Sequence, residues 1–182
     1  MNVLVGCEVS GIVRDQFRKK GHNAYSCHII PSEKDNKFHI QRDIRDLDHK
    51  KFDLGLFFPP CTYLCVSGAR WFKERRKEQK EALKFIKFLM NLPISKIAIE
   101  NPIGVISTKI RKPDQIIQPY EYGHGETKAT CLWLKNLPKL KPTNIVNGRE
   151  NKIWKMPPSK DRGLKRSITY PGIAKAMANQ WN

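Results

Sequence analysis

Apolar runs of strand length alternate with amphipathic stretches along this chain, which is the pattern of an α/β protein. Apolar positions one helical turn apart predict helices at 12–20, 73–91 and 173–180. Runs of β-branched and aliphatic residues predict strands at 2–5, 23–30, 38–40, 54–58, 95–99, 115–118 and 129–134. The alternation predicts a central, mostly parallel sheet with helices on both faces.

Polar and proline-rich segments separate these elements. Loops are expected at 31–37 and 103–114, a flexible polar connection at 123–128, and an irregular, exposed segment at 136–167. A chain of 182 residues without a long linker predicts one domain over 1–182. Because it has neither a signal peptide nor an apolar run of membrane-spanning length, we expect a soluble cytoplasmic protein.

The formal net charge of +17 is large for one small domain and indicates what kind of partner the protein binds. A polyanionic partner is the simplest cause, and nucleic acid is the commonest polyanion. The alternative is a lysine-rich proteome, in which the charge has no binding role. Five cysteines, an odd number without a Cys-x-x-Cys pair or clustered histidines, favour reduced thiols and no metal site.

The first predicted strand runs into a glycine-bearing turn, and an amphipathic helix follows. Glycines let a backbone approach a ligand, and a helix N-terminus offers free N–H groups, so this unit is typical of nucleotide-binding α/β folds. An ordinary tight turn is the alternative, because the spacing is neither Gly-x-Gly-x-x-Gly nor a P-loop. The candidate ligand-binding residues of this turn are Gly6, Cys7, Glu8, Ser10 and Gly11.

Two further candidates for ligand binding follow the second strand. In folds of this kind an acidic side chain at that strand end often holds a ribose hydroxyl. Here His28 occupies the place, and Glu33 is the nearest carboxylate. Asp43 with Ile44 could take an adenine amino group and ring edge, although Asp43 could equally be an N-cap.

Two strand ends carry the residues most suited to chemistry. The apolar run 54–58 stops at Pro59 and Pro60, because neither ring nitrogen can donate to a sheet, and Cys61 follows at once. Open α/β sheets place their ligands at such carboxyl ends, so Cys61 is a candidate nucleophile. Glu100 leaves another strand beside a proline-stiffened turn, where partial desolvation raises a carboxyl pKa and makes it a proton donor.

Together these segments resemble the DNA cytosine-5 methyltransferases, in the order of that family's motifs. Residues 3–17 resemble the first motif, Asp43-Ile44 the adenine contact, Pro59-Pro60-Cys61 the nucleophile motif and Glu100-Asn101-Pro102 the Glu-Asn-Val motif. Residues 126–134 and 170–177 weakly resemble later motifs. The chain also looks like short phage and prophage members of this group. The resemblance implies a Rossmann-like methyltransferase fold.

By this resemblance the chain is a DNA cytosine-5 methyltransferase that takes its methyl group from S-adenosyl-L-methionine, with Cys61 as nucleophile and Glu100 beside the base. Cofactor contacts would come from the glycine turn, His28, Asp43, Ile44 and Pro59. Duplex DNA with a flipped cytosine would be the substrate. The nucleic-acid contacts would be Ser67, Arg70, Trp71, Lys109, Arg111, Lys112, Lys128, Arg162, Lys165 and Arg166.

The chain departs from the family pattern in three places. The usual Phe-x-Gly-x-Gly turn is altered, His28 replaces the acid, and the irregular basic segment 135–167 stands where the family has a separate target-recognition domain. Two alternatives therefore stay open. One is a methyltransferase-like enzyme acting on free nucleotides or RNA, and the other is a non-catalytic DNA-binding protein on the same scaffold.

Overall fold

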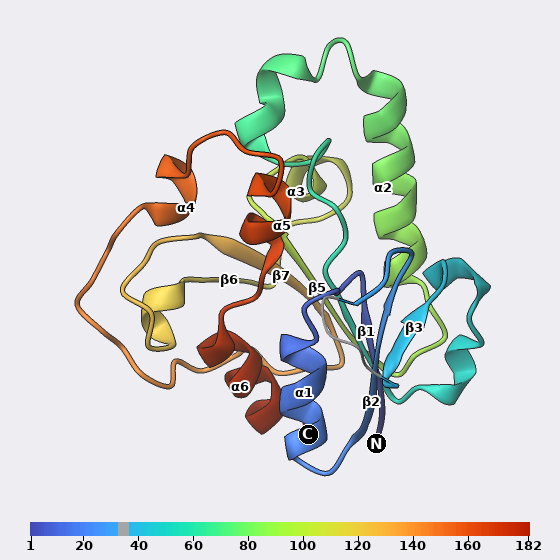
Figure 1. Ribbon diagram of the computed structural model, residues 1–182. Coiled ribbons are helices and arrows are strands. Elements are labelled where there is room, and N and C mark those ends of the chain that lie inside the picture. The colour runs from blue at the N-terminus through green and yellow to red at the C-terminus, as the bar shows by residue number, and fades with distance from the viewer. Residues whose placement is uncertain (33–36) are drawn as a thin grey trace.

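The computed structural model describes residues 1–32 and 37–182 and contains a seven-stranded sheet of order β3-β2-β1-β4-β5-β7-β6 (Figure 1). Each strand except β3 and β6, which are short outer strands, has buried residues along most of its length. The strands are β1 (Asn2–Gly6), β2 (Asn23–His28), β3 (His39–Gln41), β4 (Leu54–Phe57), β5 (Lys96–Pro102), β6 (Gln115–Ile117) and β7 (Thr130–Lys135).

The strands from β3 to β5 pair in parallel, whereas β7 runs antiparallel to both of its neighbours, β5 and β6. The mostly parallel, Rossmann-like α/β fold predicted from the sequence is therefore confirmed. The chain builds outward from β1 to β3 and then returns to place β4 on the other side of β1. This reversal makes the carboxyl ends of β1 and β4 the switch point, where open α/β sheets form a ligand crevice.

Three long helices cover the sheet, and shorter helical turns gather mainly near the carboxyl ends of the parallel strands (Figure 1). The long helices are α1 (Ile12–Lys19), α2 (Arg76–Met90) and α6 (Pro171–Gln180). The short ones are α3 (Ile106–Lys109), α4 (Lys152–Lys155), α5 (Arg162–Ser167), η1 (Ile44–Asp46), η2 (His49–Lys51), η3 (Val66–Trp71) and η4 (Pro119–Glu121).

The two faces of the sheet carry separate apolar layers. On one face, α1 and α6 lie side by side and bury Phe17 and Met177 against β1 and β4 (Figure 1). On the other face, α2 buries Ile86 and Leu89 against β5 and β7. Side chains of a strand alternate between faces, so neighbouring residues at a strand end serve different layers.

The predicted elements agree with the structure except at their ends and inside two expected loops. The strand expected at 23–30 ends at His28, and the helix expected from 73 begins at Arg76. The stretch 103–114 contains α3, and 136–167 contains α4 and α5 in otherwise irregular chain. Glu33, considered above, lies outside the described residues. Within the described residues, no helix has the length and hydrophobicity needed to cross a bilayer.

Candidate active site

The turn after β1 is tightly constrained. Gly6 has no room for a side chain, because an added Cβ would lie 2.3 Å from Ile44 and 2.6 Å from the ring of Phe57. Cys7 adopts a left-handed backbone with φ of 61°, which is uncommon for a residue with a side chain, and its N–H donates to the Cys27 carbonyl at 2.8 Å. The turn therefore presents the Cys7 side chain at the switch point.

Glu8 and Ser10 serve the start of α1. The Glu8 carboxylate accepts hydrogen bonds from the N–H groups of Val13 (2.7 Å) and Arg14 (3.4 Å) and from the Ser10 hydroxyl (3.3 Å). Gly11, at φ of 68°, has Arg14 where a Cβ would stand. The helix N-terminus, which could have bound an anionic ligand, is thus capped by the chain's own carboxylate.

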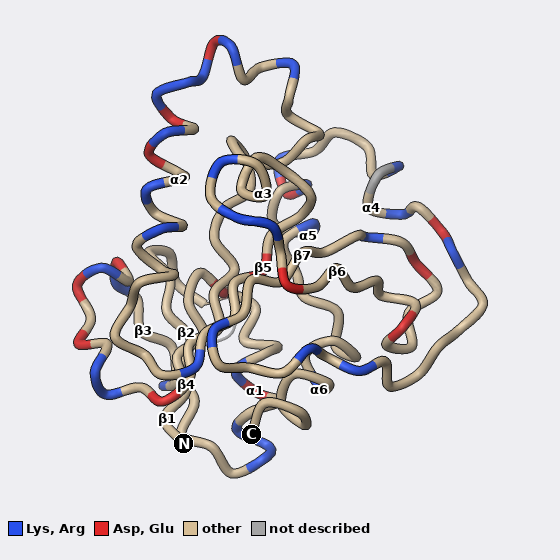
Figure 2. Tube along the Cα trace, turned by 180° about the vertical axis from the view of Figure 1, so that it is seen from behind, with Lys and Arg blue, Asp and Glu red and all other residues tan. Residues whose placement is uncertain are grey.

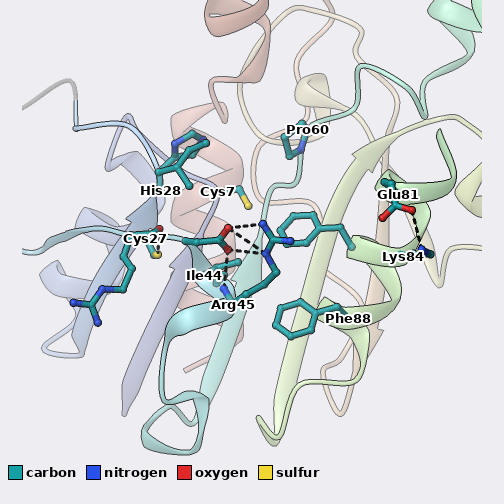
Figure 3. A pocket seen from close by; sticks show the side chains of 13 residues that line it. Cys7, Cys27, His28, Ile44, Arg45, Pro60, Glu81, Lys84 and Phe88 are labelled. Atoms are coloured by element: carbon teal, nitrogen blue, oxygen red, sulfur yellow. Dashed lines mark hydrogen bonds and ion pairs between the residues drawn. The ribbon is translucent and has the colours of Figure 1, made fainter. Parts of the chain in front are cut away.

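A cavity of about 530 Å³ lies at the carboxyl ends of β1 and β2 (Figure 3). It brings together four of the predicted cofactor residues: Cys7, His28, Asp43 and Ile44. Five of the predicted cofactor residues do not line the cavity. They lie at the end of β1 and in the turns that follow β1 and β4: Gly6, Glu8, Ser10, Gly11 and Pro59. The remaining lining residues are Cys27, Ile29, Arg42, Arg45, Pro60, Glu81, Lys84, Phe85 and Phe88.

Asp43 has one of the two roles considered for it, the N-cap, and it also lines the cavity. Its carboxylate caps η1 by accepting from the Arg45 N–H at 2.9 Å, and it also pairs with the Arg45 guanidinium at 2.5 Å. These hydrogen bonds lower the pKa of Asp43, so the carboxylate is ionised at neutral pH. Figure 3 shows this pair among the side chains that line the cavity. A ligand therefore meets a fixed, charged acceptor there.

One wall of the cavity was missed at the level of sequence. Glu81, Lys84, Phe85 and Phe88 of α2 line it, whereas the sequence predicted only an amphipathic helix over 73–91. The signal was present, because positions i, i+3, i+4 and i+7 form one stripe on a helix. The stripe mixes an ion pair, Lys84 to Glu81 at 2.8 Å, with two aromatic rings, and so does not resemble a typical binding motif.

The two thiols in the cavity are protonated. Burial is the largest cause that raises the pKa of Cys7 to about 12 and that of Cys27 to about 11, and the negative charge of Asp43 raises both further. A neutral thiol is a poor nucleophile, so these residues form apolar lining.

The segments that carry Cys61 and Glu100 are joined directly. Asn101, buried beside Glu100, donates from Nδ2 to the Pro59 carbonyl at 2.8 Å. The chain beyond Cys61 then pairs with the chain beyond Glu100, through a bridge of Cys65 with Gly104 and a hydrogen bond from Val105 to Leu64 at 2.8 Å. Two strand ends far apart in sequence thus form one unit.

Charged groups converge on Cys61. Burial raises the pKa of its thiol most, and Cys65 and Glu100 raise it further, whereas Arg166 and Lys128 lower it. Burial also raises the pKa of Glu100, against the opposing effects of Lys128 and Thr130. The predicted nucleophile and carboxylate therefore share one electrostatic environment with two cations. Cys61 is also the residue after Pro60, which lines the cavity.

Hydrogen bonds hold the segment around α5 against the residues that precede β7. Lys128 donates from Nζ to the Arg166 carbonyl at 2.9 Å. Tyr170, just beyond α5, donates its hydroxyl to Glu126 at 2.6 Å. Because Lys128 and Glu126 precede β7, these bonds fix α5 next to the strand that pairs with β5. Arg166 thereby reaches the site from a distant part of the chain.

The other predicted nucleic-acid contacts fall into two groups, one on η3 and α5 and the other at the end of α3 and in the loop after it. Ser67, Arg70 and Trp71 lie on exposed η3, and Arg162 and Lys165 lie on α5. Figure 2 shows Lys and Arg along the η3–α2 segment, along α4 and α5, and in the loop after α3.

Lys109 ends α3, and Arg111 and Lys112 lie in the loop that follows it, at another part of the molecule. Arg111 pairs with Asp114 at 2.8 Å and donates to the Leu134 carbonyl at 3.1 Å. It lines a second cavity with Ile99 and Trp133, on the α2 face of the sheet, and it is not among the charges that act on Cys61. The structure therefore does not bring Arg111 to Cys61.

Among the described residues, no group of three or more His, Cys, Asp or Glu side chains is arranged to hold a metal ion.

Comparison with known proteins gives distant likenesses among solved structures. No family model matches the chain, and no curated protein matches it. A crystal structure described as a candidate DNA modification methyltransferase encoded within an E. coli prophage is similar, with 14% sequence identity and a TM-score of 0.48. The match covers 80% of this chain and 52% of that chain, so this chain spans about half of that protein's length. Function is therefore argued from the site itself.

Proposed function

We propose that the protein is a DNA cytosine-5 methyltransferase that uses S-adenosyl-L-methionine. The observation that carries the proposal is the shared environment of Cys61 and Glu100, on joined segments beside the cavity at the switch point. A thiol and a carboxyl with a raised pKa, close enough to affect each other's charge, are the two groups that attack on a cytosine ring requires.

The cavity suits the cofactor in size and in lining. A volume of about 530 Å³ lies within the range of small-molecule sites. Phe85, Phe88 and Ile44 offer apolar surface for a purine, and the ionised Asp43 offers an acceptor for an amino or hydroxyl group. When bound, S-adenosyl-L-methionine supplies a methyl group activated by a sulfonium. Because Glu8 caps α1, the amino-acid part of the cofactor is held elsewhere than at that helix N-terminus.

Cys61 forms the bond that activates the base. Its thiol loses a proton, and the sulfur attacks carbon 6 of cytosine, which makes carbon 5 nucleophilic. Burial holds the pKa of the Cys61 thiol above its ordinary value, and the cations Lys128 and Arg166 oppose this rise, so they favour the thiolate that the attack requires. After methyl transfer, the proton on carbon 5 leaves to a base, and the sulfur–carbon bond breaks to restore the free thiol.

Glu100 supports this attack as a proton donor. Negative charge builds up on the ring as sulfur adds, and ring nitrogen 3 is one of the atoms that carries it. The raised pKa of Glu100 favours the neutral carboxyl, which donates a hydrogen bond to nitrogen 3. Asn101 keeps this geometry, because it ties the Glu100 strand end to Pro59.

The target base leaves the duplex to reach Cys61, as in other enzymes that modify a base. Exposed cations on α5 and η3 flank the site and would hold phosphates. In a single domain over 1–182, the segment 135–167 replaces a recognition domain, and its α5 reaches Cys61 through Arg166.

The decisive experiment compares Cys61→Ser with Cys65→Ser. Expression in cells followed by bisulfite sequencing locates methylated cytosines, and labelled methyl transfer to duplex DNA, RNA and dCMP gives the substrate class. We expect Cys61→Ser to abolish transfer while DNA affinity changes little, and Cys65→Ser to retain most activity. Equal activity of wild type and Cys61→Ser would exclude Cys61 as nucleophile.

A second candidate is a non-catalytic DNA-binding protein, favoured by the capped α1 N-terminus. Calorimetry separates the two. Binding of S-adenosyl-L-methionine that is weakened by Phe88→Ala supports the enzyme, and no heat at millimolar cofactor supports the binding protein.

A further inference from the structure

The second cavity, of about 640 Å³, lies on the α2 face of the sheet and has no part in the chemistry proposed above. Its lining comes from the end of α2, from β5, from the residues that follow α3 and from β7 with the residue after it. Of the residues that the structure describes, none lines both this cavity and the one at the switch point. Its volume is that of a small-molecule site, so it can hold a ligand of its own.

The floor of the second cavity is a patch of paired strand residues. Ile97 and Ile99 alternate along β5 and therefore project to one face of the sheet. Their partners across the β5–β7 pair are Lys135 and Trp133, which project to that same face. The Trp133 ring is fixed, because its Nε1 donates to the Arg111 carbonyl at 2.9 Å. A fixed apolar floor of this kind favours a ligand with a flat ring.

Three cations surround this floor, and none of the described lining residues is acidic. Lys135 belongs to the floor, and its Nζ donates to the Leu92 carbonyl at 3.2 Å, which holds the charge in place. Lys87 is exposed in the last turn of α2. Arg111 pairs with Asp114 at 2.8 Å, so one of the three charges is balanced. The excess of positive charge favours a ligand that carries a phosphate.

Two amide side chains add hydrogen-bonding groups to the lining. Asn91 donates from Nδ2 to the Lys87 carbonyl at 2.8 Å. Asn136 donates from Nδ2 to the Ser95 carbonyl, also at 2.8 Å. With Nδ2 used in this way, the Oδ1 atom of each amide is the one that can accept from a ligand. The amino groups of adenine and cytosine are donors that match such acceptors.

We propose that the second cavity binds a free nucleoside monophosphate. Its phosphate lies at Lys87 and Lys135, its base covers the apolar floor, and the amino group of the base donates to an Asn side chain. Sites for single strands take about 4–16 nucleotides, which a cavity of about 640 Å³ cannot hold, so a single nucleotide is favoured over a strand. The inference goes beyond the proposed function and does not rest on it.

The test is calorimetry of adenosine monophosphate (AMP) binding to wild type, Lys87→Ala and Lys80→Ala. Lys80 is a matched control, because it is exposed on the same helix and lines neither cavity. S-adenosyl-L-methionine is present at millimolar concentration throughout, to occupy the cavity at the switch point. We expect Lys87→Ala to weaken AMP binding about tenfold and Lys80→Ala to match wild type. Equal affinity in all three proteins would overturn the proposal.

Two fragments of AMP test the division of the cavity into a floor and a charged part. Adenosine lacks the phosphate and ribose 5-phosphate lacks the base, so each should bind wild type at least about tenfold more weakly than AMP. Lys87→Ala should leave the affinity for adenosine unchanged. An adenosine affinity equal to that of AMP would exclude the phosphate contact.

Nuclear magnetic resonance locates the bound nucleotide independently of any enzymatic activity. The indole N–H signal of Trp133 should shift when AMP is added. Trp181 is the matched control, because its buried indole donates to the Pro138 carbonyl at 2.9 Å in the apolar layer on the other face. A shift at Trp181 without one at Trp133 would contradict the assignment.

Two further outcomes are decisive. Tighter binding of a 5′-phosphorylated tetranucleotide than of AMP would overturn the assignment to a free nucleotide. If Cys61→Ser retains methyl transfer while Lys87→Ala still weakens AMP binding, the proposed chemistry fails and the nucleotide site stands.

Discussion

Glu100 is a single residue that lowers the stability of the fold while it suits the candidate site for catalysis. Its carboxyl is removed from water at the end of β5, and this burial raises its pKa above the ordinary value of 4.5. A carboxyl of this kind can donate a hydrogen bond at neutral pH, but ionising it in the folded protein costs more than in the unfolded chain. The residue most suited to catalysis is thus a source of instability.

Glu100→Gln should therefore stabilise the fold while it lowers methyl transfer. Below the unfolded-state pKa both states hold the proton, so no gain is expected at pH 4. As pH rises through the folded-state pKa, the wild type loses stability that the Gln variant keeps. The loss is on the order of 1 kcal/mol for each pH unit between the unfolded-state and the folded-state pKa. Urea unfolding at pH 4 and pH 8 measures the difference.

Glu81→Gln is the control for this measurement, because Glu81 is exposed and its pKa is lowered by the hydrogen bond from Lys84. It should show no gain at pH 8. A gain for Glu100→Gln of equal size at both pH values would point to packing instead of charge.

The elements of the fold position the site through contacts between their ends. Two loops, one after β4 and one after β5, pair with each other and so bring Cys61 to Glu100. Gly104 permits this pairing, because only hydrogen fits against the Leu64 carbonyl. Helix α2 forms one wall of the cavity through Glu81, Lys84, Phe85 and Phe88.

Gly104→Ala should separate the two loops. The added methyl group would stand 2.0 Å from the Leu64 carbonyl oxygen, which cannot move without the turn that carries it. Overpacking of this kind costs about 1–3 kcal/mol, and we expect a loss of methyl transfer larger than the loss of stability alone explains. Thermal unfolding and labelled methyl transfer on the same samples separate the two effects.

Gly163→Ala offers a matched change, because a Cβ there meets nothing within 4 Å and α5 is helical. It should leave stability unchanged or slightly improved. A Gly104→Ala protein with normal stability and activity would show that the paired loops do not hold the site.

The whole molecule has more positive charge than any single site uses. Some of the cations lie on η3, which follows Cys61, and on α5, which carries Arg166, whereas Arg111 in the loop after α3 lines a separate cavity. Figure 2 shows Lys and Arg in the loop after α3 and on α5. A ligand duplex at Cys61 can contact the first group and not the second.

Salt dependence of DNA binding should separate these groups. Each phosphate contact that is removed lowers the slope of log affinity against log salt by about 0.9. We expect Lys165→Ala on α5 to lower the slope by about this amount and Lys112→Ala in the loop after α3 to leave it unchanged. Fluorescence anisotropy over a salt series measures both. A change with Lys112→Ala alone would place the duplex at the loop after α3 instead.

The sequence by itself determined the order of strands and helices, because period and turn residues are local signals, and it singled out Cys61 and Glu100, because each follows a buried strand. Only the tertiary structure decided which charges act together. Arg166 reaches Cys61 through the bond of Lys128 to α5, whereas Arg111 faces away, and Glu8 is used by its own helix. Local patterns state what a segment becomes, whereas the partners of a side chain depend on segments distant in the chain, which meet only when the sheet has formed.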